Sequence, residues 1–192
     1  YSPSSRSGPI TFNIPDLEAD YFGTSLHKYL SAPIGTGMMY IKKEHIAKVW
    51  PLLCNGDPKS SNIRKFESLG TRSFPLEQGI GEAINFHNGI GGKRKEERVR
   101  YLKNYWAKKA LTIPGVEIHT SLKPAYSCAI SGVSIKGMTP GELGNALLSK
   151  YKIHTTSISL ANINCVRVSP HVYTRVSDLD RLVFAIGEIA EQ

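Results

Sequence analysis

Cysteine is scarce in this chain, and its cysteines do not form pairs. The three of them lie far apart, are odd in number and form no Cys-x-x-Cys motif; they are Cys54, Cys128 and Cys165. A disulfide framework or a cysteine-based zinc site needs paired, closely spaced cysteines, so the pattern argues against both. It favours a reducing, intracellular setting, and we expect a cytoplasmic protein.

Long apolar runs are also missing. No stretch approaches the roughly 20 apolar residues of a membrane-spanning helix, so we expect no membrane partner. The amino end, YSPSSRSGPI, has no apolar secretory core and is typical of a loop, a tag remnant or an interrupted start. With 41% apolar residues, the chain can still bury an ordinary globular core.

Acidic residues are fewer than basic ones, at 16 against 24, which gives a net charge of +8. This excess permits nucleic acid or an anionic ligand as partner, although solubility alone also explains it. The most basic stretch, 93–109, contains Glu96 and Glu97 and shares its aromatic positions with an apolar stripe. A solvated helix face is therefore favoured over a nucleic-acid surface. The six histidines lack the close metal-ligating neighbours of a zinc site, and no hydrolase nucleophile motif is present.

Strand-like and helix-like patterns alternate along the chain, which predicts an α/β or α+β class. Strands are expected over 21–24, 36–42, 116–119 and 129–135, and near Ile153 and Val166. Helices are expected from Pro75, over 93–113, over 139–151 and over 177–190, with an exposed loop over 54–65. One apolar face of the second helix holds Val99, Leu102, Trp106 and Ala110.

The stretch SLHKYLSAPIGTGMMYI, residues 25–41, carries the clearest chemistry. Lys28 follows His27 beside apolar residues, and an amine that loses water there becomes a better nucleophile toward carbonyls. Ser25 and His27 supply hydrogen-bond donors, and the glycines further along the stretch let the backbone approach a ligand closely. This combination suits a phosphorylated aldehyde, namely pyridoxal phosphate. The plain alternative is an ordinary surface lysine whose ammonium group extends into water.

At these residues the chain resembles the class V aminotransferases, which are fold type I pyridoxal-phosphate enzymes. The resemblance covers ADYFGTSLHKYLSAPIGTGMMYI, ESLGTRS, IPGVEI and VRVSPHVYTRVSDLDRLVFAIGEIA, in the family's order and from Phe12 onward. It implies an α/β fold of the PLP-dependent transferase type I, with the end of the large domain followed by the small carboxyl-terminal α/β domain. The expected division is 1–74 for the remnant of the large domain, 75–111 for connecting helices and 112–192 for the small domain.

The resemblance also implies roles for individual residues. Lys28 would form the internal aldimine with pyridoxal 5′-phosphate, and Ser25 and His27 would contact its phosphate. Thr71 would reach the phosphate of the neighbouring subunit, which implies a homodimer. Arg167 would hold the α-carboxylate of an amino-acid substrate, a task that suits a planar guanidinium. The plain alternatives are a loop threonine for Thr71 and a surface salt bridge for Arg167.

The chain departs from the family pattern at two places. In the family, a carboxylate keeps the pyridine nitrogen of the cofactor protonated. Ser2 occupies the corresponding position here, and no carboxylate precedes Asp16. We therefore expect the carboxyl-terminal half of a longer enzyme, weak or inactive by itself. The stretch 152–164 lacks the persulfide-forming cysteine of cysteine desulfurases, and Cys165 is expected to be a small buried hydrophobe. An isopenicillin N epimerase-like branch is favoured, with racemisation, transamination and lyase chemistry all open.

Two functions of different class remain. One is a PLP-dependent enzyme that acts on an amino acid, and the other is a catalytically silent dimerisation or binding module that keeps the fold. The missing aspartate favours the second for this chain alone. Lys28 and Arg167, each within its motif, favour the first for the parent protein, and this is the function we predict.

Overall fold

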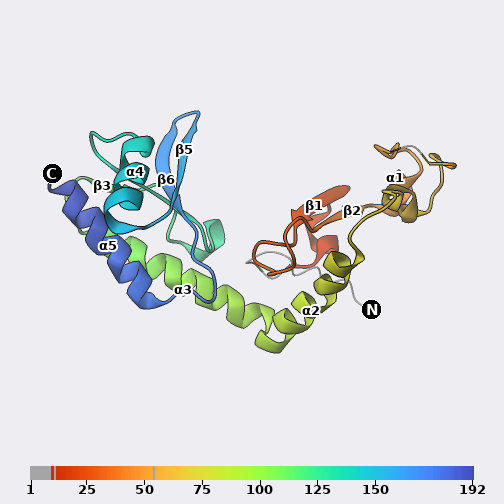
Figure 1. Ribbon diagram of the computed structural model, residues 1–192, viewed down its shortest axis with the longest axis horizontal. Helices are drawn as coiled ribbons and strands as arrows, with labels where there is room; N and C mark the ends of the chain where they lie inside the picture. The colour runs from red at the N-terminus through yellow and green to blue at the C-terminus, as the bar shows by residue number, and fades with distance from the viewer. Residues whose placement is uncertain (1–9, 11, 54) are drawn as a thin grey trace. The chain divides into compact units, whose positions relative to one another are not determined.

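The computed structural model describes residues 10, 12–53 and 55–192 and divides the chain into two compact units (Figure 1). The first unit comprises residues 1–92 and the second residues 93–192. The three-part division expected from the resemblance, 1–74, 75–111 and 112–192, remains a prediction. Within the described residues, no helix is long and apolar enough to cross a membrane.

The first unit is built on one antiparallel strand pair. Strand β1, Tyr21–Ser25, pairs with β2, Gly37–Ile41, and Ser25 lies opposite Gly37 where the connecting loop begins and ends. Both predicted strands are thus confirmed within one residue. The other elements of the unit are short turns of helix and one long helix: η1 Ile14–Leu17, α1 Lys43–Ile46, η2 Ile63–Glu67 and α2 Phe74–Ile90.

Helix α2 packs against the β1–β2 loop. The loop residues Leu26, Leu30 and Ala32 form a small buried cluster with Ala83 of the helix. Pro75 lies in the first turn of α2, where a missing N–H costs nothing, as the sequence predicts. The predicted loop over 54–65 is partly wrong, because η2 begins at Ile63, where the Asn62 side chain accepts a hydrogen bond from the Arg64 N–H at 3.0 Å.

The second unit is a four-stranded antiparallel sheet with three helices. The strand order is β3-β4-β6-β5. The strands are β3 Val116–Ile118, β4 Ser131–Ile135, β5 Thr156–Leu160 and β6 Ile163–Val168. The helices are α3 Gly92–Ala110, α4 Pro140–Tyr151 and α5 Val176–Ala190, with the short η3 Pro124–Tyr126 between β3 and β4. Figure 1 shows α5 running beside α3.

The core of the second unit confirms the predicted apolar face of α3. Val99, Leu102, Trp106 and Ala110 are at most 1% exposed, and the last three pack with residues of the sheet, α4 and α5. A helix of this length gains most of its stability from burying such a stripe. The fold class that the sequence predicts, α/β, is therefore confirmed by both the elements and their packing.

Several element boundaries differ from the predictions by one to three residues, among them the start of β4 at Ser131 instead of residue 129. The predicted helix 93–113 ends at Ala110, and the strand expected near Ile153 begins only at Thr156. Lys152 ends α4 in the left-handed conformation and Ile153 donates its N–H to Leu147, so this segment is occupied by the end of the helix. The last helix begins at Val176, one residue before the predicted Ser177.

Several basic residues of α3 have structural partners within their own unit. Arg100 bonds the carboxylate of Glu96 at 2.8 Å and the carbonyl of Pro124 at 2.8 Å. Lys103 is 1% exposed and donates to the Ser121 carbonyl at 3.0 Å and the Ser127 hydroxyl at 2.7 Å. These contacts fasten the segment between β3 and β4 to the helix, which leaves fewer of the charges for a nucleic-acid partner.

Candidate active site

The end of β1 and the β1–β2 loop together carry three of the five predicted site residues, Ser25 on the strand and His27 and Lys28 on the loop, and the loop is closed by its own backbone. The N–H of Leu26 donates to the Thr36 carbonyl at 3.0 Å, and the N–H of Ala32 donates to the Leu26 carbonyl at 3.2 Å. Ser31, in the left-handed conformation at φ 67°, donates to the Lys28 carbonyl at 3.0 Å. The segment that bears Lys28 is therefore a defined turn.

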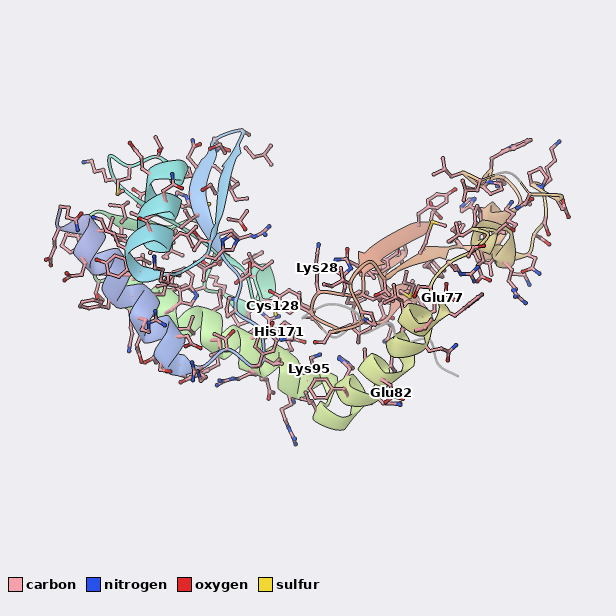
Figure 2. The ribbon with its side chains drawn as sticks, in the orientation of Figure 1. Lys28, Glu77, Glu82, Lys95, Cys128 and His171 are labelled. Atoms are coloured by element: carbon pink, nitrogen blue, oxygen red, sulfur yellow. The ribbon has the colours of Figure 1, made fainter. Side chains whose placement is uncertain are left out.

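Side chains of this loop point in two directions. Leu26 and Leu30 are buried against α2, whereas His27 is half-buried and Lys28 is exposed. Within the described residues, the Lys28 amine has no hydrogen bond or ion pair. Figure 2 shows Lys28 extending from the loop, well separated from the labelled carboxylates of Glu77 and Glu82. The amine is thus available to a ligand.

His27 is oriented by the far side of the same loop. Its Nδ1 lies 3.0 Å from the Thr36 carbonyl oxygen, which also accepts the Leu26 N–H. Thr36 is buried, and its hydroxyl and N–H both donate to the Pro33 carbonyl, at 2.7 and 3.2 Å. The imidazole is therefore hydrogen-bonded to a carbonyl whose own residue, Thr36, is fixed by its hydrogen bonds to Pro33.

Thr71 lies in the segment between η2 and α2. It is exposed and follows Gly70, whose φ of 68° favours glycine. The next residue, Arg72, bonds the Glu77 carboxylate in the first turn of α2 and contacts the ring of Phe74 at 5.2 Å. These contacts fix one side of Thr71 to the helix.

A cavity of about 500 Å³ connects the Thr71 segment with β2. It is lined by Gly37 and Met38 at the start of the strand and by Leu69 and Arg72 beside Thr71. The rest of its lining is mainly apolar and comes from β2, η2 and α2. The structure thereby brings the loop end at Gly37 and the Thr71 segment to one cavity in the first unit.

Arg167 belongs to the second unit and is placed by β6. It lies opposite Thr156 of β5 and Gly132 of β4, is exposed, and donates from Nη2 to the Thr156 hydroxyl at 3.3 Å. Within residues 12–53 and 55–192 no carboxylate pairs with it, so the surface salt bridge that was its plain alternative is absent there. His171, four residues on, stacks on Tyr173 with ring centres 4.4 Å apart.

The two cysteines that the structure describes are not placed for sulfur chemistry. Cys165 on β6 and Cys128 before β4 are 4% and 7% exposed. Burial raises the pKa of both thiols, which disfavours the reactive thiolate. The prediction that Cys165 is a small buried hydrophobe is confirmed, whereas Cys54 lies outside the described residues.

The donor set of the loop fits pyridoxal phosphate. An amine with no partner among the described residues is available for an aldehyde, and a hydroxyl and an imidazole are available for a phosphate. All three lie within the four residues from Ser25 to Lys28. The expected position of the pyridine-nitrogen carboxylate, Ser2, lies outside the described residues. The residues that fit the cofactor are therefore Lys28 at its aldehyde end and Ser25 and His27 at its phosphate end.

Comparison with known proteins decides the family. The family model described as Aminotransferase class-V matches residues 4–182. The chain belongs to the class V aminotransferase family. The family match confirms the fold class expected from the sequence, and it supports pyridoxal 5′-phosphate as the cofactor.

The chain spans about half the length of the relatives that it matches. It is 25% identical to isopenicillin N epimerase of Amycolatopsis lactamdurans, over 96% of this chain and 50% of that protein. It is 31% identical to a probable cysteine desulfurase of Ureaplasma parvum, over 92% of this chain and 47% of that protein. An apo cysteine desulfurase from Thermococcus onnurineus has the same fold, with a TM-score of 0.80 at 20% identity, covering 100% of this chain and 51% of that one.

Thr36 and Gly79 support the site, but their sequence pattern does not single them out. Thr36 belongs to a tight glycine-containing turn, and Gly79 lies inside a helical pattern. Their importance comes from contacts with His27 and Pro33 that no local spacing reports. A glycine in the middle of a predicted helix is the one signal that close packing was possible there.

Proposed function

We propose that this chain is the lysine-bearing part of a PLP-dependent enzyme that acts on an amino acid, with Lys28 as the residue that holds the cofactor covalently. The observation that carries the proposal is the unpaired, exposed Lys28 amine on a turn fixed by Thr36, inside the family's motif. When bound, pyridoxal 5′-phosphate withdraws electrons from the α-carbon of the amino acid. The chain itself supplies attachment and orientation.

Ser25 and His27 bind the phosphate in this proposal. They lie at the end of β1 and just beyond it, on the same turn as Lys28. Hydrogen bonds to a phosphate are charge-assisted and fix the direction of the group that carries it. A phosphate anchored there keeps the aldehyde within reach of the Lys28 amine.

Arg167 binds the α-carboxylate of the substrate. Two parallel N–H donors match the two oxygens of a carboxylate, and the guanidinium is not occupied by an acidic partner within the described residues. A carboxylate bound in this way fixes the orientation of the substrate, and this orientation determines which bond at the α-carbon is aligned for reaction. Racemisation, transamination and lyase chemistry all begin from this arrangement, so the reaction subtype stays open.

Cysteine desulfuration is the less supported outcome, although cysteine desulfurases are among the relatives. The stretch 152–164 contains β5 and the turn into β6 and holds no cysteine. The described thiols, Cys128 and Cys165, are buried, with pKa values raised by that burial. A persulfide-forming thiol needs exposure and thiolate character.

The test is cofactor attachment. Pyridoxal phosphate is added to the purified protein, borohydride is used to fix it, and peptides are mapped by mass spectrometry. We expect the label on Lys28, its loss in Lys28→Ala, and its retention in the matched control Lys48→Ala. A folded protein that takes no label on Lys28 would instead be the catalytically silent dimerisation or binding module. We expect these 192 residues alone to attach the cofactor with little or no turnover.

We also propose a homodimer in which Thr71 serves the phosphate site of the partner subunit. Co-expression of a Lys28→Ala chain with a Thr71→Ala chain tests this directly. If Thr71 acts across the interface, the mixed dimer has one intact site that binds the cofactor with wild-type affinity. If Thr71 acts in its own subunit, or the protein is a monomer, no site in the mixture is intact.

A further inference from the structure

Within the part of the chain that the structure describes, the ring of His27 has one hydrogen-bonding partner, and this partner fixes its tautomer. Its Nδ1 lies 3.0 Å from the Thr36 carbonyl oxygen. A carbonyl oxygen has no hydrogen to give, so Nδ1 must carry the hydrogen of this bond. A neutral imidazole holds only one such hydrogen, so Nε2 is left with a bare lone pair.

The Thr36 carbonyl has little freedom to turn away. It also accepts the N–H of Leu26 at 3.0 Å, and Thr36 is buried. The Thr36 N–H and hydroxyl both donate to the carbonyl of Pro33, at 3.2 and 2.7 Å. Pro33 in turn lies against Gly79 of α2, where a Cβ would stand 2.6 Å from the proline ring. The acceptor that sets the His27 tautomer is thus anchored through the loop to the helix.

We propose that Thr36 is a positioning residue that fixes His27 in its Nδ1–H form, so that Nε2 donates to the cofactor phosphate only after His27 has taken up a proton. The inference rests on the proposed function, in which His27 contacts that phosphate. A phosphate dianion offers only acceptors, so a bare Nε2 lone pair would face it without a hydrogen bond. One proton from solvent on Nε2 turns this contact into a charge-assisted bond.

The proposal predicts the direction in which pH changes the affinity for the phosphate. Because the bound state holds one more proton on His27, affinity for the phosphate falls as the pH rises through the titration of the ring. The other ionisable groups on the elements around this loop are Lys28, Tyr29, Tyr21, Tyr40, Glu77, Glu82 and His87. Glu77 is engaged by Arg72, and Figure 2 shows Glu82 away from the loop. Lys28 acts on the aldehyde end, so comparison with pyridoxal, which lacks the phosphate, removes its effect.

The direct test is ¹⁵N NMR of the ring on the protein labelled at histidine. Above the titration of His27, the cofactor-free protein should show the Nδ1–H tautomer, and added pyridoxal phosphate should protonate Nε2 at the same pH. An Nε2–H tautomer in the free protein, or a ring that stays neutral with the cofactor bound, would overturn the inference.

A pair of substitutions gives a second readout that does not depend on activity. His27→Gln offers an uncharged donor near the Nε2 position, and His27→Asn keeps a donor near Nδ1 but none at Nε2. For the wild type, the ratio of pyridoxal-phosphate to pyridoxal affinity should fall by up to about tenfold per pH unit above the ring titration, relative to His27→Gln. His27→Asn should bind the two ligands with more similar affinity at every pH. The same pH dependence in His27→Gln as in the wild type would contradict the proposal.

Parallel borohydride labelling separates this inference from the proposed function. Absence of label on Lys28 overturns the proposed function and the inference with it. Label on Lys28 together with an Nε2–H ring overturns the inference alone.

Discussion

Gly79 of α2 lies directly against the ring of Pro33 in the β1–β2 loop. A Cβ on residue 79 would stand 2.6 Å from Cγ of Pro33 and 3.3 Å from its Cδ, closer than side chains pack. A proline ring cannot rotate out of the way, so this approach depends on the absence of a side chain at residue 79. Since the Pro33 carbonyl holds Thr36, and Thr36 holds His27, the helix supports the geometry of the candidate site.

Gly79→Ala should therefore displace the loop. We expect a loss of about 1 to 3 kcal/mol in the free energy of unfolding, as for overpacking elsewhere, and weaker pyridoxal-phosphate binding. Urea unfolding and cofactor titration measure the two effects. Gly81→Ala is the matched control, because a Cβ there meets no atom within 4 Å and alanine favours a helix by about 0.5 to 1 kcal/mol. Equal behaviour of the two variants would contradict the loop contact.

Arg167→Lys should weaken the binding of amino acids that carry a free carboxylate. Loss of a bidentate bond to a charged group costs about 1.5 to 3 kcal/mol, which corresponds to a dissociation constant raised about tenfold or more. Titration with L-alanine, followed by the visible absorbance of the cofactor, measures it. L-alanine methyl ester, without the carboxylate, should bind both proteins alike.

The control for this substitution is Arg175→Lys, which changes an exposed arginine paired with Asp178 at 3.1 Å. It should leave both titrations as in the wild type. If Arg175→Lys weakened L-alanine binding as much as Arg167→Lys, the assigned role of Arg167 would fail.

Cys165 should react slowly with iodoacetamide in the folded protein. Burial raises the pKa of this thiol, so at any given pH its thiolate fraction is smaller than in the unfolded chain, and alkylation needs a higher pH. Mass spectrometry of time points across a pH series, with and without urea, checks this. Rapid modification of folded Cys165 near neutral pH would reopen persulfide chemistry.

Thr139→Ala should destabilise the second unit through the start of α4. The Thr139 hydroxyl accepts the Glu142 N–H at 3.2 Å, and the Glu142 carboxylate accepts the Thr139 N–H at 2.8 Å. Loss of the hydroxyl half of this capping box should lower the free energy of unfolding by about 1 kcal/mol at neutral pH, as measured in urea.

The contacts between Thr139 and Glu142 should also make the free energy of unfolding depend on pH. The backbone and hydroxyl bonds from Thr139 lower the pKa of Glu142 below its unfolded value. The contribution of the carboxylate is therefore present above the unfolded pKa and is lost as the pH falls through the folded one. Thr139→Ala keeps the backbone bond and removes the hydroxyl bond to the carboxylate, so the difference in unfolding free energy between the wild type and Thr139→Ala should narrow in acid. An unchanged difference would mean that the hydroxyl–carboxylate bond contributes nothing.

The features of this protein that repeat at short range can be predicted from its amino-acid order. The spacing of Val99, Leu102 and Trp106 reports which face of α3 is buried, because a helix brings those positions together wherever it lies. Likewise, the order Ser25, His27, Lys28 places a hydroxyl, an imidazole and an amine on one turn, and the family follows from that motif and its companions.

The contacts between segments that are distant along the chain depend on the folded structure and could not be predicted from the sequence. The approach of Gly79 to Pro33 and the cavity shared by Gly37 and Arg72 arise from packing, and periodicity carries no record of them. The same holds at shorter range for the partner of His27, since only the fold of the loop brings the Thr36 carbonyl to Nδ1. A motif fixes which chemical groups are present. Whether a group such as the His27 ring donates or accepts a hydrogen bond at a given atom depends on the partners that the fold places next to it.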